Sequence, residues 1–381
     1  MHNGFCLSMA ALLASLSGAC TFYTSCPPTD SGGSNSGAGG TGGGGGGTSP
    51  AGGAVSGNWV SVTSNLADLS SECGNMAFLS AKPDEDRLIA GISLNGLWSS
   101  QDGGESWEAL GTGPDSDTIV NRPSSIVYDP EDSQRYWESG LYNSLGIYET
   151  QDNGDTFKAL GTLAHSDLVS VDFSDPERST LLAGGHEMSQ TLSRSTDGGS
   201  NWESIADGLP ENTNCTTPLI IDSRTYLVGC GGYGGGVTGV YRSTNSGRTW
   251  LSMTTSGGAS PPLVASDKSI YWASATGGMT RSTDNGETWT DIGKGIVRNT
   301  SPIELAEGKI AALGGNAVVV SSDNGETWHE VSPPLPYNDA SGLAYSAQQK
   351  ALYVWHFTCG APPVRVPADA IMMFPFDATS I

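Results

Sequence analysis

The chain has 381 residues, of which 40 are acidic and 17 basic, and its formal net charge is −23. This length is sufficient for one large all-β domain with its own core. The negative charge repels nucleic acids and anionic lipid headgroups, so we expect no nucleic-acid partner. The five histidines are scattered and no Cys-x-x-Cys pair occurs, so we expect neither a metal site nor a cofactor.

The N-terminal segment is predicted to direct export. Residues 4–19 are apolar and small, but they are fewer than the ~20 residues that span a bilayer. We therefore interpret residues 1–19 as a signal peptide. The sequence Ser-Gly-Ala-Cys at its end resembles the cleavage region of bacterial lipoproteins, which implies a lipid anchor on Cys20 that would hold the protein at a bacterial membrane.

The next segment, residues 20–57, is predicted to be a tether. From Cys26 onward it consists mainly of Gly, Ser, Thr, Pro and Ala, with six consecutive glycines at 42–47. Such a composition cannot form a core and behaves as a flexible linker. We expect a folded domain at 58–381, monomeric and exported, which is either lipid-anchored to the cell envelope or secreted.

One nine-residue string recurs in the rest of the chain. It reads RSTDNGETW at 281–289, with copies at 99–107, 149–157, 194–202, 242–250 and 320–328. A repeat of about 40 to 50 residues is typical of a stacked array or a propeller. We call each copy a box. The Asp position of the boxes is occupied by Asp102, Asp152, Asp197, Asn245, Asp284 and Asp323.

Each repeat also contains four short strand patterns separated by turn residues, which predicts one propeller blade. After the last box, residues 341–357 and 370–376 supply three more strands without a box. At the other end, residues 58–62 begin with Trp59 and supply a single strand. We expect these segments to combine into a seventh blade, so that both termini close the propeller and no sheet edge is exposed.

The chemistry of the box explains its repetition. Its Asp can accept hydrogen bonds from backbone N–H groups of the turn. Its Gly permits a backbone conformation that a β-carbon disfavours. Its Trp buries a large ring between neighbouring sheets. Six copies favour a structural role, because an active site is normally single.

The pattern Ser-x-Asp-x-Gly-x-Thr-Trp resembles the Asp-box, also called the bacterial neuraminidase repeat. By periodicity the resemblance covers residues 58–380. Similar repeats build the propellers of sialidases, xyloglucan-degrading glycoside hydrolases, sortilin-type receptors and a photosystem assembly factor, which share a scaffold and not a function. The resemblance implies that the box hairpins lie on the face opposite to the ligand face.

The resemblance transfers no catalytic position. Sialidases carry an Arg-Ile-Pro motif and three convergent arginines, whereas the nearest match here is Asn-Arg-Pro at 121–123. Xyloglucanases place their catalytic acids between two propellers, and only one is present. The arginines that precede box serines are features of the repeat, namely Arg194, Arg242 and Arg281. Those expected on the ligand face are Arg122, Arg298 and Arg365.

An exported chain can form disulfides. Cys215 and Cys230 fall in successive predicted strands and are our first choice for a bridge. Cys73 and Cys359 are the second choice, because the two ends of a closed ring are neighbours. Cys26 then has no partner.

Four longer loops are predicted on the ligand face, at 137–146, 184–190, 229–239 and 355–366. Aromatic rings can stack on the C–H faces of sugars while polar groups bind hydroxyls, so these loops suit sugar recognition. The alternative is that the same residues only cap the blades. The expected ligand-binding residues are Tyr142, Asn143, Tyr233, Arg122, Arg298 and His356.

A catalytic role is the second hypothesis for these loops. Glu138, Glu187 and His186 could provide the acid and base of a glycosidase, which needs two carboxylates about 5 to 9 Å apart. Four aspartates on the loops between blades are equally suitable: Asp68, Asp115, Asp117 and Asp167. Met372 and Met373 are expected to pack in the core.

Our leading hypothesis is therefore surface-displayed binding of a carbohydrate or glycoprotein by one propeller face. The alternative is a glycoside hydrolase or lyase acting on a polysaccharide. A third hypothesis, from another class, is an assembly factor that binds protein.

Overall fold

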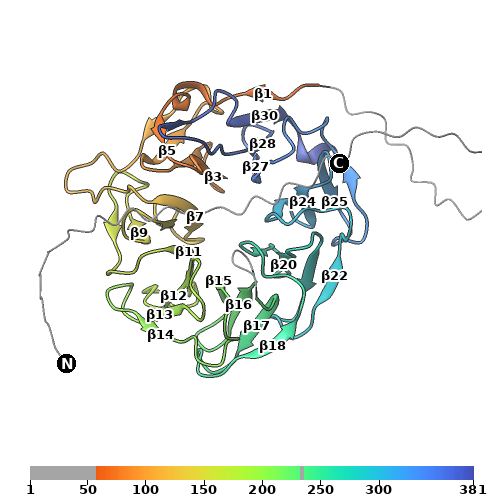
Figure 1. Ribbon diagram of the computed structural model, residues 1–381. Helices are drawn as coiled ribbons and strands as arrows, with labels where there is room; N and C mark the ends of the chain where they lie inside the picture. Colours follow the sequence, from red (N-terminus) through yellow and green to blue (C-terminus); the bar gives the residue numbers. More distant parts are fainter. Residues whose placement is uncertain (1–56, 232–235) are drawn as a thin grey trace, which may run out of the picture. The chain divides into compact units, whose positions relative to one another are not determined.

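The computed structural model describes residues 57–231 and 236–381. Within these residues the chain forms seven four-stranded antiparallel sheets and one two-stranded ribbon. Figure 1 shows the sheets arranged as blades around a common centre, which confirms the predicted all-β, seven-bladed propeller. The predicted signal peptide, Cys20, Cys26 and Tyr233 lie outside the described residues.

The first four blades follow one another along the chain. Blade 1 contains β3 (Met76–Ala81), β4 (Leu88–Ile92), β5 (Gly96–Ser100) and β6 (Glu108–Ala109). Blade 2 contains β7 (Arg122–Tyr128), β8 (Tyr136–Leu141), β9 (Ile147–Thr150) and β10 (Lys158–Ala159). Blade 3 contains β11 (Ser166–Val171), β12 (Leu181–Gly185), β13 (Leu192–Ser195) and β14 (Glu203–Ser204). Blade 4 contains β15 (Cys215–Ile220), β16 (Tyr226–Cys230), β17 (Gly239–Ser243) and β18 (Leu251–Thr254).

The remaining blades complete the ring. Blade 5 contains β19 (Leu263–Val264), β20 (Ile270–Ala273), β21 (Met279–Ser282) and β22 (Thr290–Ile292). Blade 6 contains β23 (Ile303–Ala306), β24 (Lys309–Leu313), β25 (Val318–Ser321) and β26 (His329–Glu330). Blade 7 contains β27 (Gly342–Ser346), β28 (Ala351–Trp355), β30 (Ile371–Pro375) and β1 (Val60–Ser61), and the ribbon pairs β2 (Ser70–Ser71) with β29 (Val364–Arg365). Helical structure among the described residues is limited to the short 3-10 turns η1 (Ser64–Leu66) and η2 (Ala378–Ser380), and no helix there could cross a membrane.

Both termini close the ring, as predicted. Strand β1 pairs antiparallel with β30, and Val60 and Ser61 lie opposite Met373 and Met372. The indole nitrogen of Trp59 donates to the carbonyl of Pro333 in the preceding blade at 3.5 Å. Trp250 of a box makes the same kind of contact with the blade before it, at 2.9 Å. Trp59 therefore takes the position of a box Trp in blade 7.

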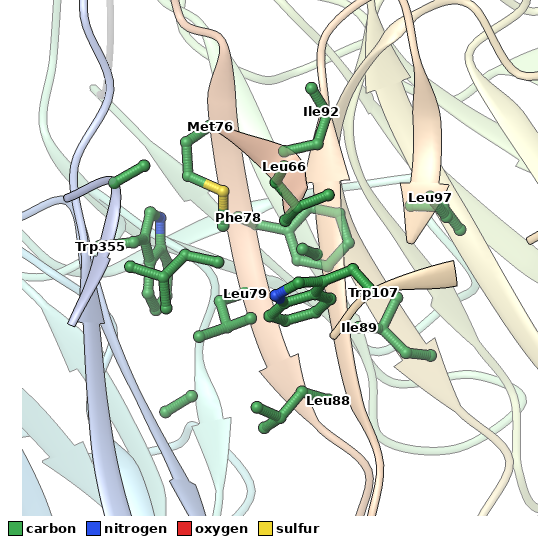
Figure 2. Close-up of a cluster of buried hydrophobic side chains, with 14 of the residues drawn as sticks. Leu66, Met76, Phe78, Leu79, Leu88, Ile89, Ile92, Leu97, Trp107 and Trp355 are labelled. Carbon is green, nitrogen blue, oxygen red and sulfur yellow. The ribbon is translucent and has the colours of Figure 1, made fainter. Parts of the chain in front are cut away.

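Large apolar side chains fill the space between neighbouring blades. Figure 2 shows one such cluster, which contains Met76 and Phe78 of β3, Trp107 of blade 1 and Trp355 of blade 7. Trp107 ends the box of blade 1, and each of these side chains is at most 8% exposed. Burial of a side chain of this size stabilises the fold by about 1.5–3 kcal/mol. The repeated Trp thus joins each hairpin to the core.

The six box hairpins share one hydrogen-bond pattern. In blade 6, Oδ1 of Asp323 accepts from the Ser321 hydroxyl at 2.7 Å and from the Thr327 N–H at 2.9 Å, and Oδ2 accepts from the Thr327 hydroxyl. These bonds, first that of the Thr327 hydroxyl, lower the pKa of Asp323 to about 2. The N–H of Gly325 donates to Ser321 at 2.8 Å. The same pattern recurs in the other boxes, except that in blade 4 the amide of Asn245 donates to the Thr249 hydroxyl.

Gly325 shows why this box position needs glycine. Its φ is +91°, and an added β-carbon would lie 2.3 Å from Cδ1 of Ile292 in blade 5. The residue before it, Asn324, also has a positive φ of 63°. Both the turn and the close approach of two blades therefore exclude larger side chains.

The connections between strands divide between two faces. The box hairpins join strands three and four and lie beside the turns that join strands one and two; for example, the N–H of Asn153 donates to the carbonyl of Gln134 at 2.8 Å. We call this the box face. The connections from strand two to three and from strand four to the next blade lie at the opposite ends of the strands. We call that side the loop face.

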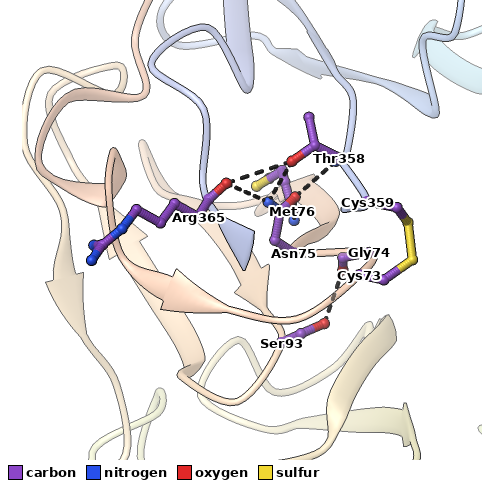
Figure 3. The surroundings of a disulfide bond; sticks show 8 residues. All are labelled: Cys73, Gly74, Asn75, Met76, Ser93, Thr358, Cys359 and Arg365. Atoms are coloured by element: carbon purple, nitrogen blue, oxygen red, sulfur yellow. Dashed lines mark hydrogen bonds between the residues drawn. A yellow bond between two sulfur atoms is a disulfide. The ribbon is translucent and has the colours of Figure 1, made fainter. Parts of the chain in front are cut away.

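Two disulfides are present among the described residues. Cys215 and Cys230, the first pair expected from the sequence, lie opposite each other on β15 and β16. Cys73 and Cys359, the second pair, join segments 286 residues apart on the loop face. Figure 3 shows the amide of Asn75 beside this bridge, donating to the Thr358 hydroxyl and to the carbonyl of Arg365 at 2.8 and 2.7 Å. We call the Cys73–Cys359 bridge and these two bonds of Asn75 the clasp, because they hold the two ends of the propeller together.

Candidate functional site on the loop face

A chain of hydrogen bonds links three polar side chains on the loop face, across blades 2 and 3. The Tyr142 hydroxyl lies 2.9 Å from Nε2 of His186. Nδ1 of His186 lies 2.9 Å from Oδ1 of Asp167. His186 is only 8% exposed, whereas Tyr142 is partly exposed. With a proton on Nδ1 facing the carboxylate, Nε2 accepts the hydrogen bond of the phenol.

The local backbone explains how these residues meet. Tyr142 follows the end of β8 and has a φ of +55°, and Glu187 has a φ of +53°, so both connections turn sharply. The N–H of His186 donates to the carbonyl of His165 at 2.7 Å, which fixes the loop of blade 3 against the end of blade 2. The Tyr142 ring meets His165 and His186 edge-on, with ring centroids 5.2 and 5.4 Å apart.

A second carboxylate lies at the same imidazole. Oε1 of Glu187 is 3.6 Å from Nε2 of His186, and the Glu187 side chain is 54% exposed. The Tyr142 hydroxyl and the Glu187 carboxylate therefore both lie near Nε2 of His186, on partly exposed side chains. Asp167 binds the opposite ring nitrogen, Nδ1. A hydroxyl whose neighbouring base is oriented by a third group is the arrangement that activates nucleophiles and general bases. The sequence predicted Tyr142, His186 and Glu187 here but gave Asp167 only as one of four aspartates.

Asn143 and Arg122 of blade 2 contact residues from the two ends of the propeller. The Asn143 amide donates to Oε1 of Glu72 at 2.9 Å. The Arg122 guanidinium lies over the ring of Phe357, 5.6 Å from its centroid. An added β-carbon on Gly74 would lie 2.4 Å from Cζ of Arg122, so the guanidinium packs directly on the backbone beside the Cys73–Cys359 bridge.

His356 forms a separate group in blade 7. Its ring stacks on Tyr337 with centroids 4.1 Å apart and planes inclined by 17°. Its two nitrogens lie 3.6 Å from Asp339 and 3.7 Å from Asp369, both of which are exposed. Tyr337 is anchored by donating to the Val354 carbonyl at 2.8 Å. Tyr337 and both aspartates could not be predicted from the sequence, because they meet His356 only when the strands of blade 7 pair.

The other two predicted arginines lie on the loop face and bind carbonyl groups. Arg298 donates to Asn338 at 2.8 Å and to Gly315 at 2.7 Å. Arg365 donates to the carbonyl of Asp68 at 2.7 Å.

Glu138 corrects our expectation of a surface carboxylate. It belongs to β8 and is fully buried. Burial raises the pKa of its carboxyl to about 8, against a lowering effect of the hydrogen bond from Asn121, whose Nδ2 lies 3.3 Å from Oε2. Oε1 has no hydrogen-bond partner among the described residues. Glu138 therefore cannot contact a polymer at the surface, and the predicted pairing with Glu187 loses one member.

Three of the four alternative aspartates also lie away from the Tyr142 chain. Asp117 accepts from the N–H of Ala159 at 2.8 Å, and the Asp115 carbonyl accepts from Lys158, so both bind the outer strand β10. Asp68 holds Arg365 through its carbonyl group. Only Asp167 joins the site.

The described residues offer no group of three or more His, Cys, Asp or Glu side chains that could hold a metal ion.

The described residues form a cavity of about 510 Å³ at the centre of the ring, between the inner strands of blades 2 to 5. Its lining is mostly apolar and includes Val169, Leu219 and Pro261, while Lys268 and Asn285 lie at the box face. It does not contain the predicted site residues.

The chain is similar to known propellers. The family model of the DUF6242 beta propeller domain matches residues 220–354, less than half of the chain. No curated protein matches the sequence. The extracellular domain of a putative hybrid two-component system from Bacteroides thetaiotaomicron superposes with a TM-score of 0.56 and 11% identity, covering 80% of this chain and 40% of that one.

Two further solved structures are similar in fold. YCF48 bound to D1 peptide gives a TM-score of 0.54 at 14% identity and covers 85% of this chain and 98% of that one. The GH74 xyloglucanase from Xanthomonas campestris superposes with a TM-score of 0.51 and 15% identity, and the match covers 81% of this chain and 43% of that one. The chain thus spans less than half the length of the xyloglucanase and of the Bacteroides protein. These likenesses support the fold alone.

Proposed function

We propose that the loop face binds a carbohydrate or a glycoprotein. The observation that carries the proposal is the Tyr142–His186–Asp167 chain, which holds a partly exposed aromatic ring in place with buried polar support. A fixed ring loses little conformational entropy when a sugar stacks on it, and the nearby Glu187 and Asn143 can bind hydroxyls. The resemblance of the boxes to the Asp-box supports the same face, since it implies that ligands bind opposite the box hairpins.

Binding to immobilised polysaccharides and glycoproteins tests the proposal. Tyr142→Ala removes the ring and should weaken binding at least about tenfold, since stacking and its support are lost together. Tyr142→Phe keeps the ring but loses the bond to His186, so it should retain part of the affinity. Leu251→Ala is the control, because Leu251 is 70% exposed on the rim strand β18. Tyr142→Ala binding as tightly as the unmodified protein would contradict the proposal.

A second candidate is a glycoside hydrolase or lyase. It is favoured by the position of Glu187, whose carboxylate lies 3.6 Å from Nε2 of His186. The Tyr142 hydroxyl binds the same nitrogen, so a hydroxyl that can donate a proton lies near a carboxylate that can accept one. Mass spectrometry of a polysaccharide panel would detect released sugars. Glu187→Gln should abolish release and spare binding if this candidate is right. A blank across the panel would leave binding as the function.

The third candidate, a protein-binding assembly factor, is an outcome of the same tests. A polypeptide ligand that binds equally to the unmodified protein and to Tyr142→Ala would support it. The likeness to YCF48 bound to D1 peptide supplies the fold for such a role and no contact residue.

We further propose that the protein is exported and displayed on a tether, with a lipid on Cys20. The apolar N-terminal segment and the glycine-rich stretch support this. Labelling of expressing cells with a radioactive fatty acid tests it: Cys20→Ser should abolish labelling.

A further inference from the structure

The arginines of the two faces have different partners. All 11 arginines lie in the described residues. On the box face, six arginines form ion pairs with carboxylates: Arg87, Arg135, Arg178, Arg194, Arg242 and Arg281. Arg224 and Arg248 are exposed on turns of the same face. On the loop face, none of the three arginines forms an ion pair with a described carboxylate.

Each loop-face arginine is held by neutral groups instead. Arg298 and Arg365 donate to backbone carbonyls, and Arg122 lies over Phe357 and against Gly74. Such contacts fix the position of a guanidinium while leaving its charge uncompensated. In a chain of net charge −23, in which carboxylates outnumber cations, three unpaired arginines on one face need a separate explanation.

Arg122 is the best placed of the three for a ligand. It begins β7, its Cα is paired with that of Leu141, and Tyr142 follows directly, so it borders the proposed binding site. Asn75, one residue after the Gly74 that packs on Arg122, donates to the carbonyl of Arg365. Arg122 thus packs on the segment whose Asn75 also binds the backbone of Arg365, and Figure 3 shows this segment with Arg365.

We propose that the glycan bound by the loop face is acidic, and that Arg122 binds a carboxylate or sulfate group on the sugar. The inference rests on the proposed function and names the class of its ligand. A planar guanidinium binds either anion through two parallel hydrogen bonds. The negative net charge of the protein repels such a ligand at long range. At physiological salt this repulsion is screened beyond about 8 Å, whereas a direct contact with Arg122 is screened less.

Two pairs of polymers test the inference on the unmodified protein. Polygalacturonate and its methyl ester differ in carboxylate charge, and a sulfated galactan and its desulfated form differ in sulfate charge. The account predicts at least about tenfold tighter binding to the charged member of one pair, and that pair names the anion. If net charge alone governed binding, the neutral member would bind better. Equal or tighter binding of the neutral members would overturn the inference.

A variant pair locates the contact. Arg122→Gln should remove most of the preference for the charged polymer over the neutral one. Arg248→Gln changes the net charge equally on the opposite face and should have no effect. An equal loss in both variants would overturn the role of Arg122.

The two proposals fail in different ways. Equal binding of charged and neutral polymers overturns only the acidic ligand, whereas no binding to any polysaccharide or glycoprotein also overturns the proposed function. Since the polymer comparison needs no substitution, it decides the matter even if Arg122→Gln fails to fold.

Discussion

The box face and the loop face of this propeller are built from the same blades but satisfy their polar groups differently. On the box face one hairpin is repeated six times, and in each copy the hydroxyl of its Ser or Thr is hydrogen-bonded to its Asp or Asn. On the loop face the connections differ from blade to blade, and Tyr142, Asn143 and His356 occur once each. Repetition therefore marks the residues that hold the fold, and single occurrence marks the candidates for function.

Carboxylates show the same contrast. Desolvation by burial raises the pKa of Asp102 in the box of blade 1, but the hydrogen bonds from Ser106 and Ser100 together outweigh it and lower this pKa to about 2. Burial raises the pKa of Glu138, in β8 of blade 2, to about 8, against the lowering effect of its single amide partner. Environment therefore decides which acid remains charged.

The largest expected effect comes from opening the clasp on the loop face. Replacing both Cys73 and Cys359 with Ala frees segments 286 residues apart, and the loop-entropy relation gives a loss of about 5.6 kcal/mol in the free energy of unfolding. Replacing Cys215 and Cys230, 15 residues apart, should cost about 3 kcal/mol by the same relation. Urea unfolding measures both. A smaller loss for the first pair would show that the closed ring does not depend on its clasp.

The next effect concerns pH. Below pH 4.5 the Glu138 carboxyl is protonated in both the folded and unfolded chain. As pH rises from 4.5 to about 8, the unfolded chain releases this proton while the folded chain retains it, so the free energy of unfolding should fall by a few kcal/mol. Glu138→Gln should remove this decrease, and Glu105→Gln, at an exposed position of a box, should not. If the free energy of unfolding fell equally with pH in the unmodified protein and in Glu138→Gln, this result would contradict the account.

The smallest effect is expected within a box. Asp323→Ala removes the acceptor of three hydrogen bonds and should cost about 1–2 kcal/mol in urea unfolding. Asp323→Asn should cost less than about 0.5 kcal/mol, because Asn245 already occupies the same position and keeps its bonds to Ser243 and Thr249. If Asn and Ala were equally costly, the charge of the box Asp, and not its acceptor geometry, would be the source of stability.

Sequence reasoning predicted the blades because the box recurs at a regular spacing and its chemistry is local. It also predicted the closure, since Trp59 repeats the box Trp. It misplaced Glu138 because Ser139 and Gly140 suggested a loop. In the structure Gly140 lies within β8, where an added β-carbon would come within 2.2 Å of Asn121, so close packing and not a turn requires glycine.

The site was less accessible to sequence reasoning. Tyr142 and His186 stood out as single residues in long loops, but nothing in their spacing indicated a contact between blades. Asp167 could not be distinguished from Asp115 or Asp117, because all three lie in connections between blades and only tertiary structure shows which one meets an imidazole. Two of the arginine ion pairs, Arg178–Asp129 and Arg242–Glu287, likewise join neighbouring blades.

Hydrogen–deuterium exchange of the protein with and without a bound glycan tests the central claim most directly, because it reports both faces in one experiment. The account predicts slower exchange in peptides of the loop face, at 137–146, 184–190 and 355–366, and unchanged exchange in the six box hairpins. Protection of the box hairpins with unchanged loops would contradict the division of roles between the two faces.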